Sequence, residues 1–152
     1  MAVPENVVKT SDFDFFSQEE AEVFDNTVGI RRRHVAPDNM CASDMCQAAA
    51  EKLLEELGWE RDSIDVLLFE SVTGDYRTPP TSCILQDRLA LSENCFCMDI
   101  PMGCCGCMYA ITVAGNLLTT GNVKRALLLI GDTALRMGCL LYTSDAADDR
   151  IS

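Results

Sequence analysis

The residues best suited to chemistry in this chain are cysteines at the junction of two apolar segments. Residues 95–100 predict a buried strand, and the apolar segment that starts at Cys104 predicts a helix that ends at Gly121. A turn over residues 101–103 joins them. Cys104 therefore lies at a predicted helix start, where unpaired N–H groups and the helix dipole favour thiolate over thiol. Such a cysteine is suited to nucleophilic catalysis, and its own N–H is placed to serve a developing oxyanion.

Five of the nine cysteines fall within thirteen residues, so a metal or redox site is an alternative. These five are Cys95, Cys97, Cys104, Cys105 and Cys107. Cys104 and Cys107 have the C-x-x-C spacing of zinc and redox sites, but a closed zinc site needs a second pair at a suitable distance. Cys95 and Cys97 alternate with apolar residues, which is typical of packing on one strand face. Gly106 and the apolar helix after it favour a nucleophile turn, and a buried inert thiol is the other interpretation of Cys104.

Composition limits the class of protein. The 152 residues are enough for one domain with a core, and a hydrophobic content of 48% is ordinary for a globular protein. The formal net charge of −12 argues against nucleic acid or an anionic membrane as the main partner. No apolar run approaches the roughly 20 residues of a membrane span, and no signal peptide is visible at Met1. Nine cysteines in such a chain predict reduced thiols, which indicates the cytoplasm.

The remaining periodicity predicts an α/β fold with parallel strands, because strands and helices alternate along the chain. Helices are predicted over residues 17–24, 42–57, 81–89 and 104–118. Strands are predicted over residues 65–71, 95–100 and 125–132, the last expected beside the strand at 95–100. Ser17 begins a capping box with Glu20, and Ser43 and Thr81 are expected to cap the next two helices. Cys83 is expected in the core.

The residues around Cys104 also resemble a known family. The string DIPMGCCGCMYAITVA is similar to the active-site segment of beta-ketoacyl-acyl-carrier-protein synthase III, a condensing enzyme of thiolase-like fold. The residues that match the order of that segment are Asp99, Gly103, Cys104, Gly106, Tyr109 and Ala110. The resemblance covers about residues 3–136. It implies the N-terminal half of a thiolase-like α/β fold, truncated, with a mixed sheet and a buried central helix.

The resemblance implies a specific reaction. Cys104 would take an acyl group from acyl-CoA or another acyl thioester, and decarboxylating malonyl-acyl-carrier protein would then attack the acyl-cysteine. The product would be a 3-oxoacyl-carrier protein in fatty-acid or related acyl synthesis, with no cofactor or metal beyond these substrates. Acyl carrier protein is the implied partner, and the full-length enzyme is expected to be a homodimer. Other thiolase-fold enzymes, of polyketide or hydroxymethylglutaryl-CoA synthase type, are alternatives, as is a cysteine-rich metal or redox module.

The family's catalytic His and Asn belong to its C-terminal half. The 152-residue chain is therefore expected to carry half of an active site and to be inactive in condensation by itself. His34 is the only histidine, and its position does not match the family's catalytic His. We interpret it as a hydrogen-bonding residue.

Three further residues are candidates for substrate binding. The run 29–34 contains three adjacent arginines and resembles the family's Gly-Ile-Arg-x-Arg stretch, with Arg31 and Arg33 in place. These arginines are either a solvated loop that balances carboxylates or an anion site for phosphopantetheine or a CoA phosphate. Thr78 aligns where many members carry a Phe that closes the partner subunit's pocket, so it implies room for a longer or branched acyl group. Chain-length profiling of the full-length enzyme tests this hypothesis, and a strict preference for acetyl starters would contradict it.

The last residues do not continue the pattern. We interpret residues 1–138 as the N-terminal part of a thiolase-like condensing-enzyme domain. The string CLLYTSDAAD, which begins at Cys139, resembles a translated sequencing adapter, and residues 144–149 are acidic and of low complexity. Residues 139–152 are therefore expected to be a non-native tail.

Overall fold

The computed structural model of the chain describes residues 1–14 and 16–136. By their contacts these residues form two compact units. One is Val3–Met40, and the other contains the residues from Cys41 onward together with Met1 and Ala2. The tail expected at 139–152 lies outside the described residues, so the boundary near residue 138 stays a prediction.

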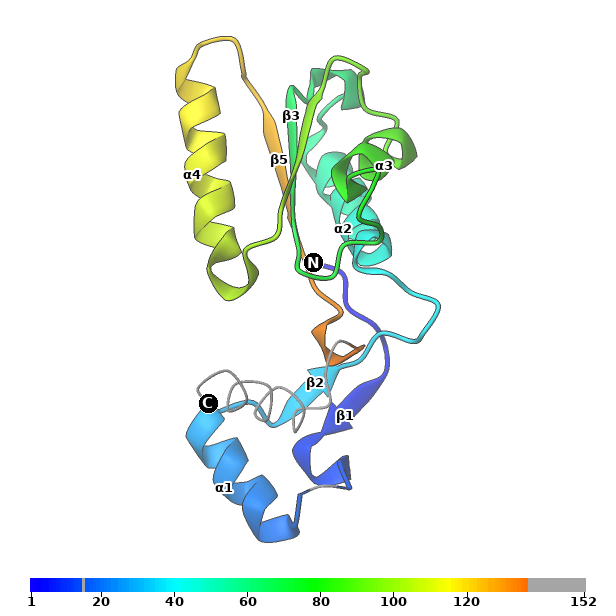
Figure 1. The fold of residues 1–152 in the computed structure, drawn as a ribbon. Coiled ribbons are helices and arrows are strands. Elements are labelled where there is room, and N and C mark those ends of the chain that lie inside the picture. The colour runs from blue at the N-terminus through cyan, green and yellow to red at the C-terminus, as the bar shows by residue number, and fades with distance from the viewer. Residues whose placement is uncertain (15, 137–152) are drawn as a thin grey trace. The chain divides into compact units, whose positions relative to one another are not determined.

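The smaller unit contains one antiparallel pair of short strands and one α-helix (Figure 1). Strand β1 (Val7–Lys9) is antiparallel to β2 (Arg32–His34), and helix α1 (Gln18–Val28) comes between them in sequence. The predicted capping box is confirmed, because Ser17 Oγ accepts the N–H of Glu20 and the Glu20 carboxylate accepts the N–H of Ser17. α1 ends later than expected, where Gly29 adopts a φ of 78° and closes the helix.

The larger unit is built on a three-stranded parallel sheet with the order β4-β3-β5. Its strands are β3 (Val66–Glu70), β4 (Phe96–Ile100) and β5 (Ala126–Ile130). The parallel α/β prediction is confirmed, but the expectation that the last strand lies beside the strand at 95–100 is wrong. β3 separates them, since all five of its residues are buried and a strand that is apolar on both faces takes the central position.

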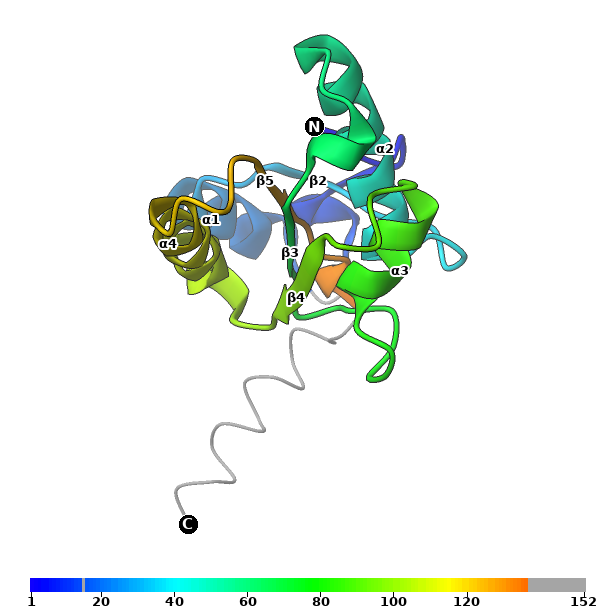
Figure 2. The ribbon, with the colours of Figure 1, turned by 90° about the horizontal axis from the view of Figure 1, so that it is seen from above.

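Helices cover both faces of this sheet (Figures 1 and 2). Helices α2 (Ala42–Leu57) and α3 (Thr81–Arg88) lie on one side, and α4 (Gly106–Thr119) lies on the other. Side chains alternate along β3, so Leu67 and Phe69 join the core under α2 and α3, whereas Val66 and Leu68 join the core under α4. Two separate apolar layers therefore hold the sheet between its helices.

Three expectations about single residues are wrong. Thr81 does not cap α3, because Pro80 is the N-cap residue and Thr81 Oγ1 accepts the N–H of Asp75 instead. α2 has the predicted bounds, but Cys41 is its N-cap rather than Ser43. Ser43 is fully buried, and its Oγ donates to Asp75. It is the second residue of α2 and contacts Arg88 of α3, so its hydroxyl does not cap α2. Cys83 is exposed rather than part of the core.

Helix α4 is buried on one face only within the described residues. Gly106, Ala110 and Ala114 pack toward the sheet. The opposite face exposes the large side chains Met108, Tyr109, Ile111 and Leu118.

None of the helices in the described part of the chain combines the length and the apolar character needed to cross a membrane.

Candidate functional site

Cys104 lies in the turn that joins β4 to α4. β4 ends at Ile100, a 3-10 turn follows over Gly103–Cys105, and α4 begins at Gly106. Gly103 has a φ of 62°, a conformation that glycine adopts without strain. The side chain of Cys104 is exposed. The structure therefore places this exposed sulfur in the turn just before the apolar helix, which begins at Gly106 and not at Cys104 as predicted.

The other described thiols of the larger unit differ in exposure, and Cys41 and Cys107 are half-buried. Cys83 and Cys105 are exposed like Cys104. Burial raises the pKa of Cys46 to about 11 and the pKa of Cys97 to about 12. Burial also raises the pKa of Cys95. Cys95 and Cys97 share the core under α2 and α3, as their alternation predicts. The core thiols Cys46, Cys95 and Cys97 are thus protonated at neutral pH, which leaves the thiols outside this core as candidates for the nucleophile.

Gly106 allows a buried carboxyl group to lie against the first turn of α4. A Cβ built on Gly106 would be 2.5 Å from Cγ of Glu70 and would also overlap Cδ and Oε1. The Glu70 side chain is only 2% exposed, and Oε1 has no hydrogen-bond partner in the described residues. Burial, with a smaller contribution from Asp132, raises the pKa of Glu70. Sequence reasoning missed Glu70, and its one signal was an acidic residue at the end of the apolar run VLLFE.

Asp99 has a positioning role in the same region. Its two carboxylate oxygens accept the backbone N–H groups of Thr81 at 2.7 Å and Ser82 at 2.8 Å. These donors open α3, so Asp99 caps a helix that Pro80, its N-cap residue, cannot cap with a side chain. Asp99 therefore ties the strand that leads to Cys104 to the neighbouring helix.

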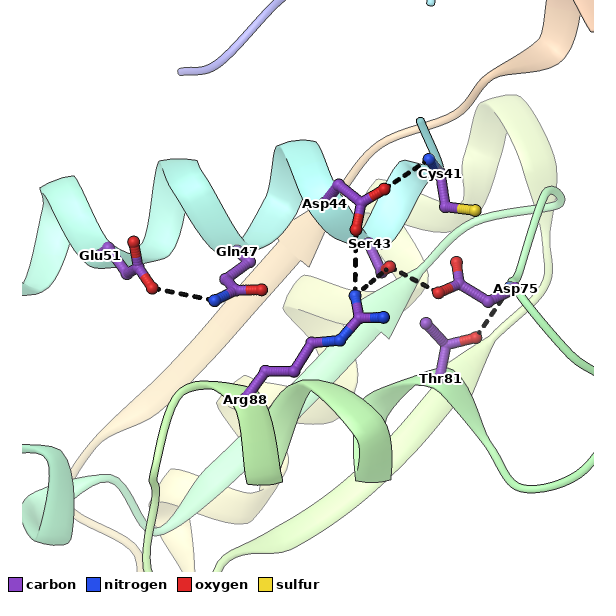
Figure 3. Close-up of polar contacts among 8 residues, drawn as sticks. All are labelled: Cys41, Ser43, Asp44, Gln47, Glu51, Asp75, Thr81 and Arg88. Atoms are coloured by element: carbon purple, nitrogen blue, oxygen red, sulfur yellow. Dashed lines mark hydrogen bonds and ion pairs between the residues drawn. The ribbon is translucent and has the colours of Figure 1, made fainter. Parts of the chain in front are cut away.

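Polar contacts fix both ends of the loop that carries Thr78 (Figure 3). Ser43 Oγ donates to Asp75 at 2.5 Å and accepts from Arg88 Nη1 at 2.9 Å. The Asp75 N–H donates to Thr81 Oγ1 at 3.1 Å. Thr78 itself is exposed. The loop is thus held by α2 and α3 while the residue predicted to contact substrate stays open to solvent.

These features gather at one edge of the sheet, because the carboxyl ends of parallel strands β3, β4 and β5 point the same way. The loop after β3 carries Thr78, and the turn after β4 carries Cys104. Asp132 follows β5, and its Oδ1 accepts from Ser71 Oγ at 2.9 Å and from the Val72 N–H at 2.8 Å. This edge is where α/β folds bind ligands.

Arg31 and Arg33, the two arginines that are candidates for substrate binding, belong to the Val3–Met40 unit and differ in their contacts. Arg33 Nη1 donates to Thr10 Oγ1 at 3.1 Å, and its guanidinium lies 5.4 Å from the ring centroid of Phe24. Arg31 is exposed and makes no hydrogen bond or ion pair with another described residue. His34 Nδ1 lies 2.6 Å from the carbonyl oxygen of Pro4. Arg33 therefore supports its own unit, and Arg31 is the more available of the two.

Metal ligands do not cluster in the part of the chain that the structure describes. No group of three or more His, Cys, Asp or Glu residues is arranged there to hold a metal ion. The C-x-x-C motif at residues 104–107 is thus not extended by further ligands among the residues described.

Comparison with known proteins gives a consistent result, although no family model matches the chain. Beta-ketoacyl-[acyl-carrier-protein] synthase III of Xanthomonas oryzae is 33% identical over 135 residues, which are 89% of this chain and 41% of that protein. The protein of the same name from Geobacillus kaustophilus is 34% identical over 130 residues, 86% of this chain and 42% of that protein.

Solved structures agree. A 3-oxoacyl-(acyl-carrier protein) synthase from Burkholderia xenovorans superposes with a TM-score of 0.79 at 40% identity, covering 84% of this chain and 37% of that chain. A 3-oxoacyl-(acyl-carrier-protein) synthase III gives a TM-score of 0.81 at 29% identity, covering 89% of this chain and 40% of that one. The architecture is therefore that of the thiolase-like condensing enzymes.

Within that class, the chain is homologous to the N-terminal part of beta-ketoacyl-acyl-carrier-protein synthase III. It spans about two fifths of the length of the curated relatives it matches, 41% for the Xanthomonas oryzae protein. The resemblance found from the residues around Cys104 is thereby confirmed, as is the thiolase-like α/β fold.

Proposed function

We propose that this chain supplies the nucleophile of an acyltransferase of beta-ketoacyl-acyl-carrier-protein synthase III type, and that Cys104 is this nucleophile. The observation that carries the proposal is the exposed Cys104 sulfur at the leading end of α4. The positive end of the helix dipole favours the negative charge of an oxyanion that develops beside this sulfur. The names of the relatives support the same chemistry.

The proposed first step is acyl transfer to sulfur. The Cys104 thiolate attacks the carbonyl carbon of an acyl thioester, the turn's N–H groups hold the oxyanion, and the CoA thiolate leaves as the acyl-cysteine forms. In the second step malonyl-acyl-carrier protein loses CO₂, and its carbanion attacks the acyl-cysteine and releases the Cys104 thiolate. The family uses a His and an Asn for this step, and both lie outside the region matched here. The proposal requires no cofactor besides these substrates.

The acyl-enzyme step is directly testable in the chain. Incubation with acetyl-CoA is expected to add one acetyl group to Cys104, measured by intact mass and peptide mapping, while no 3-oxoacyl product forms. Cys104→Ala should abolish the adduct, because it removes the sulfur proposed to attack the thioester. Cys83→Ser, which changes another exposed thiol, should leave the adduct unchanged. Acetylation that persists in Cys104→Ala would contradict the proposed nucleophile.

Arg31 is the proposed contact for a phosphate of CoA or of carrier-protein phosphopantetheine. Because Arg31 is exposed and unengaged among the described residues, its guanidinium is available for a phosphate. Arg31→Ala is expected to weaken CoA binding about 3- to 10-fold, the loss of a charge-assisted contact, as measured by calorimetry. Arg32→Ala is the matched control, since Arg32 is also exposed but does not match the family's stretch. Equal losses in both variants would indicate only general charge attraction.

The remaining site residues belong to the same proposal. Arg33, held by Thr10 and Phe24, is expected to position the arginine segment rather than to bind substrate alone. Thr78 is proposed to leave space for a longer or branched acyl group in the pocket of a partner subunit. A homodimer of the full-length enzyme and a cytoplasmic location are part of the proposal as well.

A further inference from the structure

The proposed acyl transfer uses one sulfur of the C-x-x-C motif and leaves the other unexplained. Cys104 is exposed, and Cys107 is half-buried in the first turn of α4. An exposed cysteine followed three residues later by a less exposed one, at the start of a helix, is the arrangement of a thiol that attacks and a thiol that resolves.

The backbone brings these two cysteines within reach of each other. The distance between their Cα atoms depends on the two residues between them. Both are right-handed helical, with φ −93° and ψ −6° at Cys105 and φ −58° and ψ −34° at Gly106. Such a turn separates the flanking Cα atoms by about 5–6 Å, within the range of about 4.4–6.8 Å that disulfides accept. Residues three apart on a helical turn are also neighbours on its surface.

The third cysteine of the motif is directed elsewhere. Cys105 Sγ donates to the carbonyl oxygen of Met102 at 3.3 Å, back toward the loop that precedes the turn. A disulfide between the adjacent residues Cys104 and Cys105 would have to break this contact. Among the described thiols near α4, Cys107 is therefore the natural partner of Cys104.

We propose that Cys104 and Cys107 form a reversible disulfide under mild oxidation by a peroxide. The Cys104 thiolate attacks one oxygen of hydrogen peroxide, the O–O bond breaks, and hydroxide leaves and becomes water, which gives a sulfenic acid. The Cys107 sulfur then attacks the Cys104 sulfur, the S–O bond breaks, and hydroxide leaves with the Cys107 proton as a second water. Two thiols lose two electrons and the peroxide is reduced to two waters.

The disulfide would protect Cys104 from irreversible oxidation and block its attack on thioesters. Protection depends only on the two sulfurs, because a disulfide is reduced by thiols whereas a sulfinic acid is not. The block on acyl transfer rests on the proposed function. Disulfide formation and acetylation are thus measured separately, and either can fail without the other.

The test treats the reduced chain with hydrogen peroxide and follows it by mass spectrometry. Wild-type chain is expected to lose two hydrogens, with the bond mapped to Cys104 and Cys107, and its Cys104 alkylation rate should fall about tenfold and recover with dithiothreitol. Cys107→Ser should form no disulfide at Cys104. It should instead accumulate sulfenic acid at Cys104, which dimedone traps, and later sulfinic acid. Cys105→Ser is the matched control and should behave as wild type.

Circular dichroism of the variants separates loss of the bond from loss of the fold. A folded Cys107→Ser chain that still forms a reversible disulfide at Cys104 would overturn the pairing. So would a wild-type chain whose Cys104 proceeds to sulfinic acid as fast as in Cys107→Ser. A bond mapped to Cys104 and Cys105 would overturn it too.

Discussion

Gly106→Ala is expected to lower the free energy of unfolding by about 1–3 kcal/mol, the cost of overpacking a closed site. Alanine is the better helix former by up to about 1 kcal/mol, so propensity alone predicts the opposite sign. Overpacking wins because the added Cβ would overlap the Glu70 side chain, which is 2% exposed and cannot swing into solvent. Urea unfolding followed by circular dichroism measures the change.

Gly115→Ala is the matched control for this prediction. Gly115 is in the same helix, and a Cβ there meets nothing within 4 Å, so this variant should gain about 0.5–1 kcal/mol from propensity. In a Gly106→Ala chain, adding Glu70→Ala shortens the side chain that the new Cβ would overlap. The double variant should recover most of the lost free energy of unfolding, and a double-mutant cycle then gives the coupling energy between the two positions. Equal stabilisation by both glycine substitutions would show that Glu70 does not pack against the first turn of α4.

The local elements of this chain could be predicted from sequence because each carries its own signals. α2 has the predicted bounds of residues 42–57, ended by Gly58 in a left-handed conformation. The Ser17 capping box forms as its spacing predicts. The site turn was also predictable, because a strand, a glycine-containing turn and an apolar helix follow each other around Cys104.

Errors arose where a residue's role depends on distant neighbours. The order of strands was wrong because periodicity does not report which strand is central, and only the two-sided burial of β3 decides it. Ser43 was expected to cap a helix because serine is a common N-cap residue. Its hydroxyl instead donates to Asp75 and accepts from Arg88 of α3. Cys83 was expected in the core because free cysteines usually are buried, yet it is exposed in the folded chain.

Glu70 shows the same limit at the candidate site. From sequence it was the last residue of an apolar run, and nothing local indicated that its carboxyl group would lie under Gly106. Its position follows from the parallel register, which aligns Glu70 with Ile100 and Ile130 and leaves it between two apolar strand ends. A buried carboxyl group at this edge is therefore a property of the assembled sheet.

Glu70→Gln is expected to stabilise the chain at neutral and alkaline pH by about 1–3 kcal/mol, because glutamine removes the charge of a buried carboxylate that lacks a partner on Oε1. Burial raises the pKa of Glu70 from its ordinary value of 4.5, so the folded state binds the proton more tightly than the unfolded state. The stability that this group provides is present below pH 4.5 and is lost as the pH rises through the folded-state pKa. Glutamine does not titrate, so the advantage of Glu70→Gln should grow with pH over that window.

Urea unfolding at a series of pH values measures this advantage, and Asp65 provides a control of opposite sign. The N–H groups of Lys124 and Arg125 lower the pKa of Asp65 below its ordinary value of 3.8. The stability that this carboxylate provides is therefore present above pH 3.8 and is lost as the pH falls through the folded-state pKa, and Asp65→Asn should lack it. If Glu70→Gln were less stable than wild type at alkaline pH, the Glu70 carboxylate would have to be solvated or paired in the folded chain. The ionised Glu70 side chain would then not lie buried against Gly106.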